Sequence, residues 1–420
     1  QAEDGIRDDL VTGVQTCALP ISFQQSTSLL IRMQPMLAPV MHPVTVRVHH
    51  WFVPTRLLWP DAFEDFITGG PDGTGTAEDY PTNSGTYTVN AGTLGDYFGL
   101  PTGVAFLDGQ ISMLPFRAYN MIYNEWYRDQ DLITELAEDQ DTVPFCAWEK
   151  DYFTRSRPWA QKGPSVSIPI GGSAPVIGES ANARPQYRDQ DGNLRTIDSI
   201  SSSQNVQLNA AAGSTAGELE WNDPQLVADL TNATSADVRD VRLAFALQRY
   251  QEARAQYGSR YTEYLRYLGI RPSDARLQRP EYLGGGKQTI AFSEVLRTGS
   301  NEDAATTEPI GQLRGHGIAA MRTNRYRYFC EEHGFILSLM SVRPRTMYQN
   351  GINRLWSRRT KESYYQRELE LIGQQEIENG EIYAQGTTAD ADTFGFNDRY
   401  SEYRHQHSGV CGEFRALLDY

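Results

Sequence analysis

Long apolar runs and paired cysteines are the features that this sequence most clearly lacks. Its longest apolar stretches, such as residues 335–342, fall far short of the roughly 18 residues that a membrane span requires, so we expect no membrane insertion. The four cysteines, Cys17, Cys146, Cys330 and Cys411, lie far apart without paired spacing. That spacing fits neither a disulfide framework nor a zinc site, and it predicts reduced, structural thiols.

Basic residues are also scarce. The chain has 38 Lys+Arg against 53 Asp+Glu and a formal net charge of −15, which argues against a protein that binds nucleic acid through its overall field. Only four of the basic residues are lysines, and the other 34 are arginines. The planar arginine side chain suits bidentate pairing and aromatic stacking at contact surfaces. A coding bias from a GC-rich source is the alternative explanation for this excess.

The ends and the length of the chain set further bounds. The acidic segment 1–10 lacks the basic n-region of a signal peptide, so we expect a soluble chain that is neither secreted nor anchored. Since single cores rarely grow beyond roughly 250–300 residues, 420 residues indicate either two domains or one core with large insertions.

Residues 11–22 read VTGVQTCALPIS, which is similar to the in-frame translation of a sequencing-library adapter rather than to a protein motif. We therefore expect residues 1–22 to be a non-biological, adapter-derived segment and biological sequence to begin near Phe23. Original sequencing reads that run without interruption through the Ser22–Phe23 junction would contradict this hypothesis.

Several segments have the patterns of strands and helices. Val44, Val46 and Val48 alternate with polar residues, which predicts a half-buried strand that ends at residues 51–54. The stretch 325–330 alternates in the same way, and residues 335–342 are apolar on both faces, as in a strand covered on both sides. A helix is predicted from Leu114, because six apolar residues follow at spacings of three and four: Phe116, Tyr119, Ile122, Tyr123, Trp126 and Tyr127.

Residues 171–232 differ from the rest of the chain. They are rich in Ser, Ala, Asn, Gln and Gly, contain one Trp, one Tyr and no Phe, and carry three Arg against eight acidic residues. Such a segment can build little core of its own and is typical of an insertion. Ser235 is then expected to begin the longest helix, which Gly258 ends. Its predicted buried stripe contains Val238, Val241, Leu243, Ala244, Leu247, Tyr250, Ala253 and Tyr257.

Short strands separated by long loops, without alternating βα units, favour a mainly β fold, a sandwich with inserted helices. The search for chemistry is largely negative. Residues 284–287 read GGGK but lack the flanking residues of a phosphate-binding loop, so we interpret them as a flexible turn or a close backbone approach. His405 and His407 would share one face of a strand, yet no third ligand completes a metal site. We expect no catalytic, metal or cofactor site.

Arginines interleave with aromatic residues in the last third of the chain, which has a net positive stretch at residues 269–345. This pattern can serve single-stranded nucleic acid through stacking and phosphate contact. Pairing with acidic faces of neighbouring segments or subunits is the alternative. The candidate subunit-interface or DNA-facing residues are Arg322, Arg325, Arg327, Arg343, Arg345, Arg358 and Arg359.

Several ordered blocks carry a family resemblance. They read LIRMQPMLAPVMH at 30–42, HWFVPTRLLW at 50–59, EDFITGG at 64–70, LPFRAYN at 114–120, NEWYRD at 124–129, QKGPSVSIP at 161–169, SDARLQRPEYLGGGK at 273–287, RTNRYR at 322–327 and SVRP at 341–344. Together they resemble the major capsid protein of Microviridae, in particular the gokushovirus-like bacteriophages. Only residues 171–232 are free of the resemblance between about Ser28 and Tyr420.

The resemblance implies a jelly-roll β-barrel with long inserted loops and helices, formed as one domain by residues 23–420. It implies self-assembly into a T=1 icosahedral shell around circular single-stranded DNA, which is held non-specifically, together with other virion proteins that include a small basic DNA-binding protein. The implied location is the virion, after a stage in the host cytoplasm. Residues 171–232 take the place of the variable insertion that such capsids project from the three-fold axes, and we expect them to contact the host cell surface.

The resemblance also implies that relatives carry further sequence at both ends. If strands are missing, unpaired sheet edges would be exposed, so we expect residues 1–420 alone not to form closed shells. A jelly-roll carbohydrate-binding protein or glycosidase is the alternative function, because a carboxylate pair for glycoside hydrolysis is always available among 53 acidic residues.

Overall fold

The computed structural model describes residues 9–17, 21–33, 42–60, 62–68, 80–166, 176–178, 186–188, 194–200, 206–208, 220–223, 226–228, 238–257, 261–270, 278–296 and 313–412. By its internal contacts the chain divides into two compact units. Unit 1 contains Gln1–Lys162 and Glu252–Tyr420, and unit 2 contains Gly163–Gln251. The insertion predicted at 171–232 falls within unit 2.

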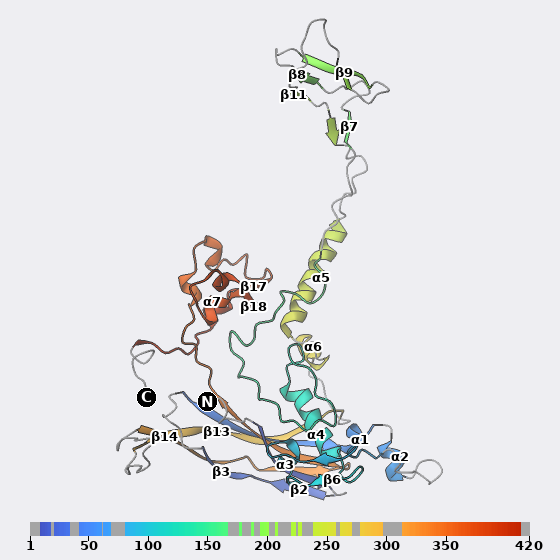
Figure 1. Cartoon of the computed structure of the whole chain (residues 1–420), viewed down its shortest axis with the longest axis vertical. Helices are drawn as coiled ribbons and strands as arrows, with labels where there is room; N and C mark the ends of the chain where they lie inside the picture. Colours follow the sequence, from blue (N-terminus) through green and yellow to red (C-terminus); the bar gives the residue numbers. More distant parts are fainter. Residues whose placement is uncertain are drawn as a thin grey trace. The chain divides into compact units, whose positions relative to one another are not determined.

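Unit 1 is built on a six-stranded antiparallel sheet with the order β1-β16-β4-β13-β14-β3. Strands of this sheet, with β3, β13 and β14 labelled, curve side by side in Figure 1. Its strands are β1 (Asp9–Cys17), β3 (Ser28–Arg32), β4 (Val44–Pro54), β13 (Glu281–Leu296), β14 (Leu313–Arg322) and β16 (Gly334–Pro344). The mainly β, jelly-roll-type fold is thereby confirmed.

Strand β16 is the second strand of this sheet, between β1 and β4, and its first eight residues are all buried. This confirms the strand with two covered faces at 335–342. Strand β4 alternates as expected over Val44–Val48, and its end at Pro54 agrees with the predicted end at residues 51–54. It continues to Pro54 because Phe335 and Gly334 of β16 keep pairing with Val53 and Pro54.

The two faces of the sheet are covered by different elements. One face packs Trp51, Val53, Leu337 and Leu339 against α1 (Thr55–Leu58), α3 (Leu94–Tyr97) and α4 (Leu114–Ile122). The other face has one cluster around Val44, Val46 and Val48 and a second cluster around Phe52 and Ile336. The paired strands β2 (Ile21–Gln25) and β15 (Tyr326–Cys330) cover the second cluster. The predicted helix stripe is core as expected: Phe116, Tyr119, Ile122 and Tyr123 are buried, and a π-helical turn at Tyr123–Tyr127 follows.

Residues 284–287 form part of β13. Their interpretation as a flexible turn is therefore wrong. The close backbone approach is confirmed: a Cβ atom at Gly285 would lie 2.1 Å from the backbone oxygen of Val48. Only a glycine lets β13 approach β4 in this way.

The remaining elements of unit 1 are short. They are α2 (Phe63–Thr68), β5 (Tyr87–Thr88), β6 (Ala105–Phe106), α6 (Tyr261–Tyr267), β17 (Gln374–Glu378), α7 (Asn379–Ile382), β18 (Thr393–Asp398) and 3₁₀ turns at Arg354–Trp356, Lys361–Ser363, Thr388–Ala391 and Ser401–Arg404. Strands β17 and β18 pair and enclose a small core of Tyr152, Phe153 and Ile377.

Unit 2 contains short strands and most of the longest helix (Figure 1). The strands are β7 (Val176–Gly178), β8 (Gln186–Arg188), β9 (Leu194–Ile200), β10 (Val206–Leu208), β11 (Glu220–Asp223) and β12 (Leu226–Ala228), and they form one four-stranded and one two-stranded sheet. Helix α5 (Val238–Tyr257) confirms the predicted helix, while Ser235 and Gly258 lie outside the described residues.

The prediction that the apolar stripe of α5 is buried is wrong for the single chain. Val238 is 66% exposed, Leu243 63%, Leu247 42% and Tyr250 41%. Among the residues of this helix whose burial the structure describes, 238–256, Gln251 and Ala255 are buried. The periodicity that predicts burial is therefore present, but several of its large apolar side chains are exposed among the described residues.

Candidate functional site

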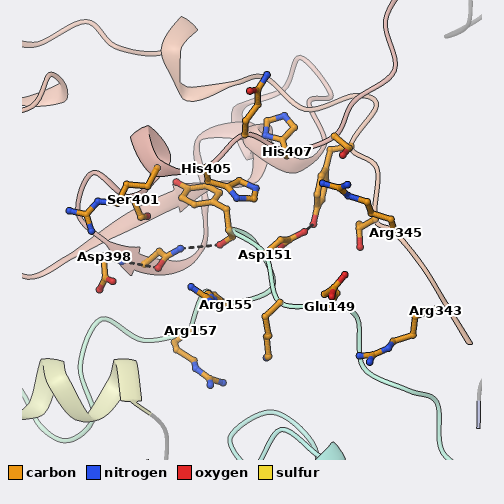
Figure 2. A pocket seen from close by; sticks show the side chains of 18 of the residues that line it. Glu149, Asp151, Arg155, Arg157, Arg343, Arg345, Asp398, Ser401, His405 and His407 are labelled. Atoms are coloured by element: carbon orange, nitrogen blue, oxygen red, sulfur yellow. Dashed lines mark hydrogen bonds between the residues drawn. The ribbon is translucent and has the colours of Figure 1, made fainter. Parts of the chain in front are cut away.

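A charged cavity of about 960 Å³ lies in unit 1, where three segments distant in sequence meet. The loop 149–157, the end of β16 with residues 343–348, and residues 396–408 supply most of its lining. Figure 2 shows Arg343 and Arg345 on one side of the cavity, Arg155 and Arg157 on another, and the rings of His405 and His407 above them. The lining contains seven Lys or Arg side chains and three carboxylates: Lys150, Arg155, Arg157, Lys287, Arg343, Arg345, Arg404, Glu149, Asp151 and Asp398.

The carboxylates of the cavity are already engaged. Asp151 accepts hydrogen bonds from the Tyr348 hydroxyl at 2.7 Å and from the Thr154 backbone N–H at 2.8 Å. Burial raises the pKa of Asp151, but these hydrogen bonds outweigh it and the pKa is lowered. Glu149 pairs with Arg47 at 2.6 Å, and Asp398 accepts hydrogen bonds from Gln256 and Gln374.

The cations fall into two groups. Lys150 and Arg157 are neutralised by Asp129, at 2.9 Å each, and Arg404 pairs with Glu370. In contrast, no carboxylate of the described residues lies within 4 Å of the charged groups of four cations: Arg155, Lys287, Arg343 and Arg345. Arg343 does donate a hydrogen bond to the Ala147 carbonyl at 3.3 Å, which holds its side chain at the rim. The cavity is therefore electropositive, and a polyanion could enter it.

Aromatic rings and two buried polar atoms complete the lining. His405 stacks on Tyr152 with ring centroids 5.7 Å apart, and His407 meets Tyr348 edge-on at 5.7 Å. Burial lowers the pKa of His407. Ser401 Oγ and His405 Nε2 are buried without a hydrogen-bond partner in the described part of the chain, which is uncommon for polar atoms of a folded protein.

The prediction that His405 and His407 lie on a strand is wrong, since they follow the 3₁₀ turn Ser401–Arg404 in an irregular segment. Their rings nonetheless stack at 6.4 Å. The described residues contain no group of three or more His, Cys, Asp or Glu arranged for a metal ion. Among the helices in the described ranges, none has the length and apolar character that spanning a bilayer demands.

Of the seven arginines singled out from the sequence, the structure brings only Arg343 and Arg345 to this cavity. Arg322 and Arg327 are exposed on β14 and β15, Arg325 immediately precedes β15, and Arg359 is exposed on a loop. Arg358 lies between Glu402, at 3.3 Å, and the ring of Tyr403, whose centroid is 4.0 Å away.

Sequence reasoning missed several cavity residues, including Arg155, Lys287 and Tyr348. A local signal existed for one of them, because 155–158 read RSRP and repeat the arginine spacing of 343–345. For Lys287 no such signal existed, since only the pairing of β13 with β4 brings it near the cavity.

Comparison with known proteins gives consistent matches. The family model described as "Capsid protein (F protein)" matches residues 5–420. The capsid protein VP1 of Bdellovibrio phage phiMH2K is 35% identical over 422 residues, which cover 94% of this chain and 77% of that protein. The VP1 proteins of Chlamydia phage 1 and Spiroplasma virus 4 are 30% and 32% identical, covering 94% and 93% of this chain and 79% and 77% of those proteins.

These matches support a structural capsid role and not the carbohydrate-binding or glycosidase alternative. A capsid role implies self-assembly, a place in the virion and no enzymatic task. The chain belongs to the capsid protein (F protein) family of the microviruses.

Proposed function

We propose that this chain is the repeating subunit of a small T=1 icosahedral shell that encloses circular single-stranded DNA, and that the cavity binds DNA phosphates. The observation that carries the proposal is a group of four rim cations that have no carboxylate partner in the part of the chain that the structure describes, although the chain has a net charge of −15: Arg155, Lys287, Arg343 and Arg345. Such a local patch neutralises phosphates although the overall field is repulsive. Stacking surfaces such as Tyr348 and His407 beside it suit unpaired bases.

The shell is tested by expressing the chain together with any flanking coding sequence of its source genome. Closed particles of uniform diameter are expected in electron micrographs, with a sedimentation coefficient far above that of the subunit. A protein that stays monomeric at high concentration would contradict the proposed shell. No hydrolysis of polysaccharides is expected, because the proposed role is structural.

The DNA contact is tested with a matched pair of double variants. Arg343→Ala with Arg345→Ala removes two cavity cations, whereas Arg322→Ala with Arg359→Ala removes two exposed arginines outside it. With a single-stranded oligonucleotide, the cavity variant is expected to bind about tenfold more weakly and to lower the salt slope by about 1.4, that is about 0.7 per lost phosphate contact. Equal effects of both variants on anisotropy titrations would refute a cavity-specific contact.

The proposed capsid role also predicts two partners, the host cell surface and a small basic virion protein. We propose that residues 171–232 form an exterior protrusion at the three-fold axes that contacts the host surface, since this segment is polar and acidic. Particles without residues 171–232 are expected to assemble but to lose adsorption to the host, and unchanged adsorption would disprove the contact.

A small basic virion protein is expected to neutralise most of the DNA, because the capsid chain itself is acidic. We expect assembly to take place in the host cytoplasm.

A further inference from the structure

Three cations lie close together on one face of the sheet of unit 1, beside the cavity. Arg47 of β4 is directly opposite Lys287 of β13, and Arg343 of β16 is opposite Thr45, two residues from Arg47 along β4. Since residues two apart on a strand share a face, the three cationic side chains share one face of the sheet. We refer to Arg47, Lys287 and Arg343 as the cation row. Like charges directly opposite each other destabilise a sheet, so an anion beside Arg47 and Lys287 stabilises their placement.

The chain itself supplies one anion to the cation row. Arg47 Nη2 donates a hydrogen bond to Glu149 Oε1 at 2.6 Å, and Arg343 Nη1 donates one to the Ala147 carbonyl at 3.3 Å. Figure 2 shows Glu149 and Arg343 on the same side of the cavity. We refer to residues 145–149, which have no regular secondary structure, as the strap. Polar contacts to two arginines of the row therefore hold the strap.

The contact between the strap and Arg47 is incomplete. Glu149 accepts a hydrogen bond from one nitrogen of the guanidinium, whereas Arg47 Nε is buried without a hydrogen-bond partner in the described part of the chain. The Glu149 side chain is 55% exposed, and exposed ion pairs contribute little stability. Phe145 and Trp148 of the strap are also exposed. Because an arginine can donate two parallel N–H groups to a phosphate, a phosphate on Arg47 can use Nε as well as Nη2.

The surroundings of the cation row stay positive although Glu149 is present. His49 follows Arg47 on the same face of β4, and its Nδ1 lies 2.7 Å from the Tyr127 hydroxyl. Burial, and then the charges of Arg47 and Arg343, lower the pKa of His49 to about 4. One carboxylate therefore does not neutralise the row, and a ligand that brings several negative charges is favoured there.

We propose that Glu149 occupies a phosphate position, so that the strap competes with DNA for Arg47 and is displaced when DNA binds. This inference concerns the regulation of the proposed DNA contact and rests on it. A single strand that binds the rim cations Lys287 and Arg343 brings its neighbouring phosphates to Arg47, because Arg47 lies directly opposite Lys287. The exchange replaces a carboxylate by a phosphate and leaves neither cation without an anion.

Removal of the Glu149 charge tests the competition in the full chain. Glu149→Gln is expected to bind a single-stranded oligonucleotide about fivefold more tightly than the parent, because no ion pair has to be broken first. Glu294→Gln removes the same charge from an exposed position of β13 and is expected to change the affinity by less than about twofold. In an Arg47→Ala background, Glu149→Gln is expected to have no effect. Equal tightening by the two glutamine variants, or tightening that persists without Arg47, would overturn the competition.

The displacement itself is measured at Cys146, a partly exposed residue of the strap. In a Cys411→Ser background, a saturating oligonucleotide is expected to speed the alkylation of Cys146 by N-ethylmaleimide about fivefold, because the thiol becomes accessible. The buried Cys330 serves as the internal control, and peptide mass spectrometry separates the two sites. Protection of Cys146 by the oligonucleotide, or an unchanged rate, would contradict the displacement.

The two measurements also distinguish the strap from the DNA contact on which it rests. Circular dichroism checks that Glu149→Gln and Arg47→Ala keep the fold of the parent. Binding that Arg343→Ala with Arg345→Ala weakens, together with an unchanged alkylation rate at Cys146, would refute the strap alone. A parent chain that does not bind the oligonucleotide would count against the proposed DNA contact, and the strap inference would fail with it.

Discussion

Strand β16 and helix α5 both have an apolar pattern in sequence, yet their apolar side chains differ in exposure. In β16, Leu337 is fully buried and neighbouring residues on both faces are covered by the helices α1, α3 and α4 or by the β2–β15 ribbon. In α5, Leu243 remains 63% exposed. The comparison teaches that an apolar period indicates that a side chain is covered, but not whether its own chain or another one covers it.

The largest loss of unfolding free energy is expected from a substitution in the core beside the sheet. Leu337→Ala leaves a cavity between β16 and the helices that cover it, and such cavities cost about 3–4 kcal/mol of unfolding free energy. Urea unfolding of the subunit measures this loss directly. A loss below about 1 kcal/mol would show that this face of the sheet is loosely packed, and the contrast with α5 would disappear.

A second substitution is expected to disrupt the sheet by forcing two strand backbones apart rather than by removing a buried side chain. Gly285→Ala places a methyl group 2.1 Å from the Val48 oxygen, so β13 and β4 must separate locally. We expect a loss of about 2–3 kcal/mol, comparable with other overpacked core positions. Gly103→Ala serves as the control, because it has a positive φ but open space around it, and about 1 kcal/mol is expected there. Equal losses at both positions would refute the close approach as the cause.

These glycines also show how much of the fold can be predicted from the sequence. The strands around Val44–Val48 and at 335–342 follow from alternation, since burial repeats every two residues there. The GGGK segment has the composition of a turn, and only the register of β13 against Val48 shows that its glycines serve a long strand. Local composition cannot report a partner that lies more than 200 residues away.

The cavity is less predictable for the same reason. Arg343 and Arg345 stand out in sequence, but so do Arg322 and Arg358, which the structure places elsewhere. What separates these arginines is their neighbours: Glu402 pairs with Arg358, while the rim arginines have no carboxylate within reach in the described ranges. Such pairings depend on tertiary contacts, which one sequence does not display.

A smaller effect is expected from the ion pairs that hold the loop beside the cavity. Burial raises the pKa of Asp129, but hydrogen bonds from Lys150 and Arg157 and their charges outweigh it and lower the pKa to about 2. Because the folded pKa lies below the ordinary value of 3.8, the stabilisation is complete above about pH 4 and is lost as pH falls towards 2.

Asp129→Asn removes this contribution. The variant is expected to be about 1–2 kcal/mol less stable than the parent at pH 7, and the difference should shrink as the pH falls from 4 to 2. Urea unfolding across this pH range gives both curves. A difference that stays constant down to pH 2 would mean that the lost hydrogen bonds, and not the titration of Asp129, stabilise the loop.

The smallest effect is expected on α5, and it depends on concentration. At low protein concentration Leu243→Ala should change the unfolding free energy by less than about 0.5 kcal/mol, because little buried area is lost and alanine favours the helix. At high concentration the parent should gain stability that the variant lacks, since association stabilises only the folded chain. Thermal unfolding over a hundredfold dilution series separates the two regimes. A parent melting temperature that does not depend on concentration would show that Leu243 takes no part in self-association.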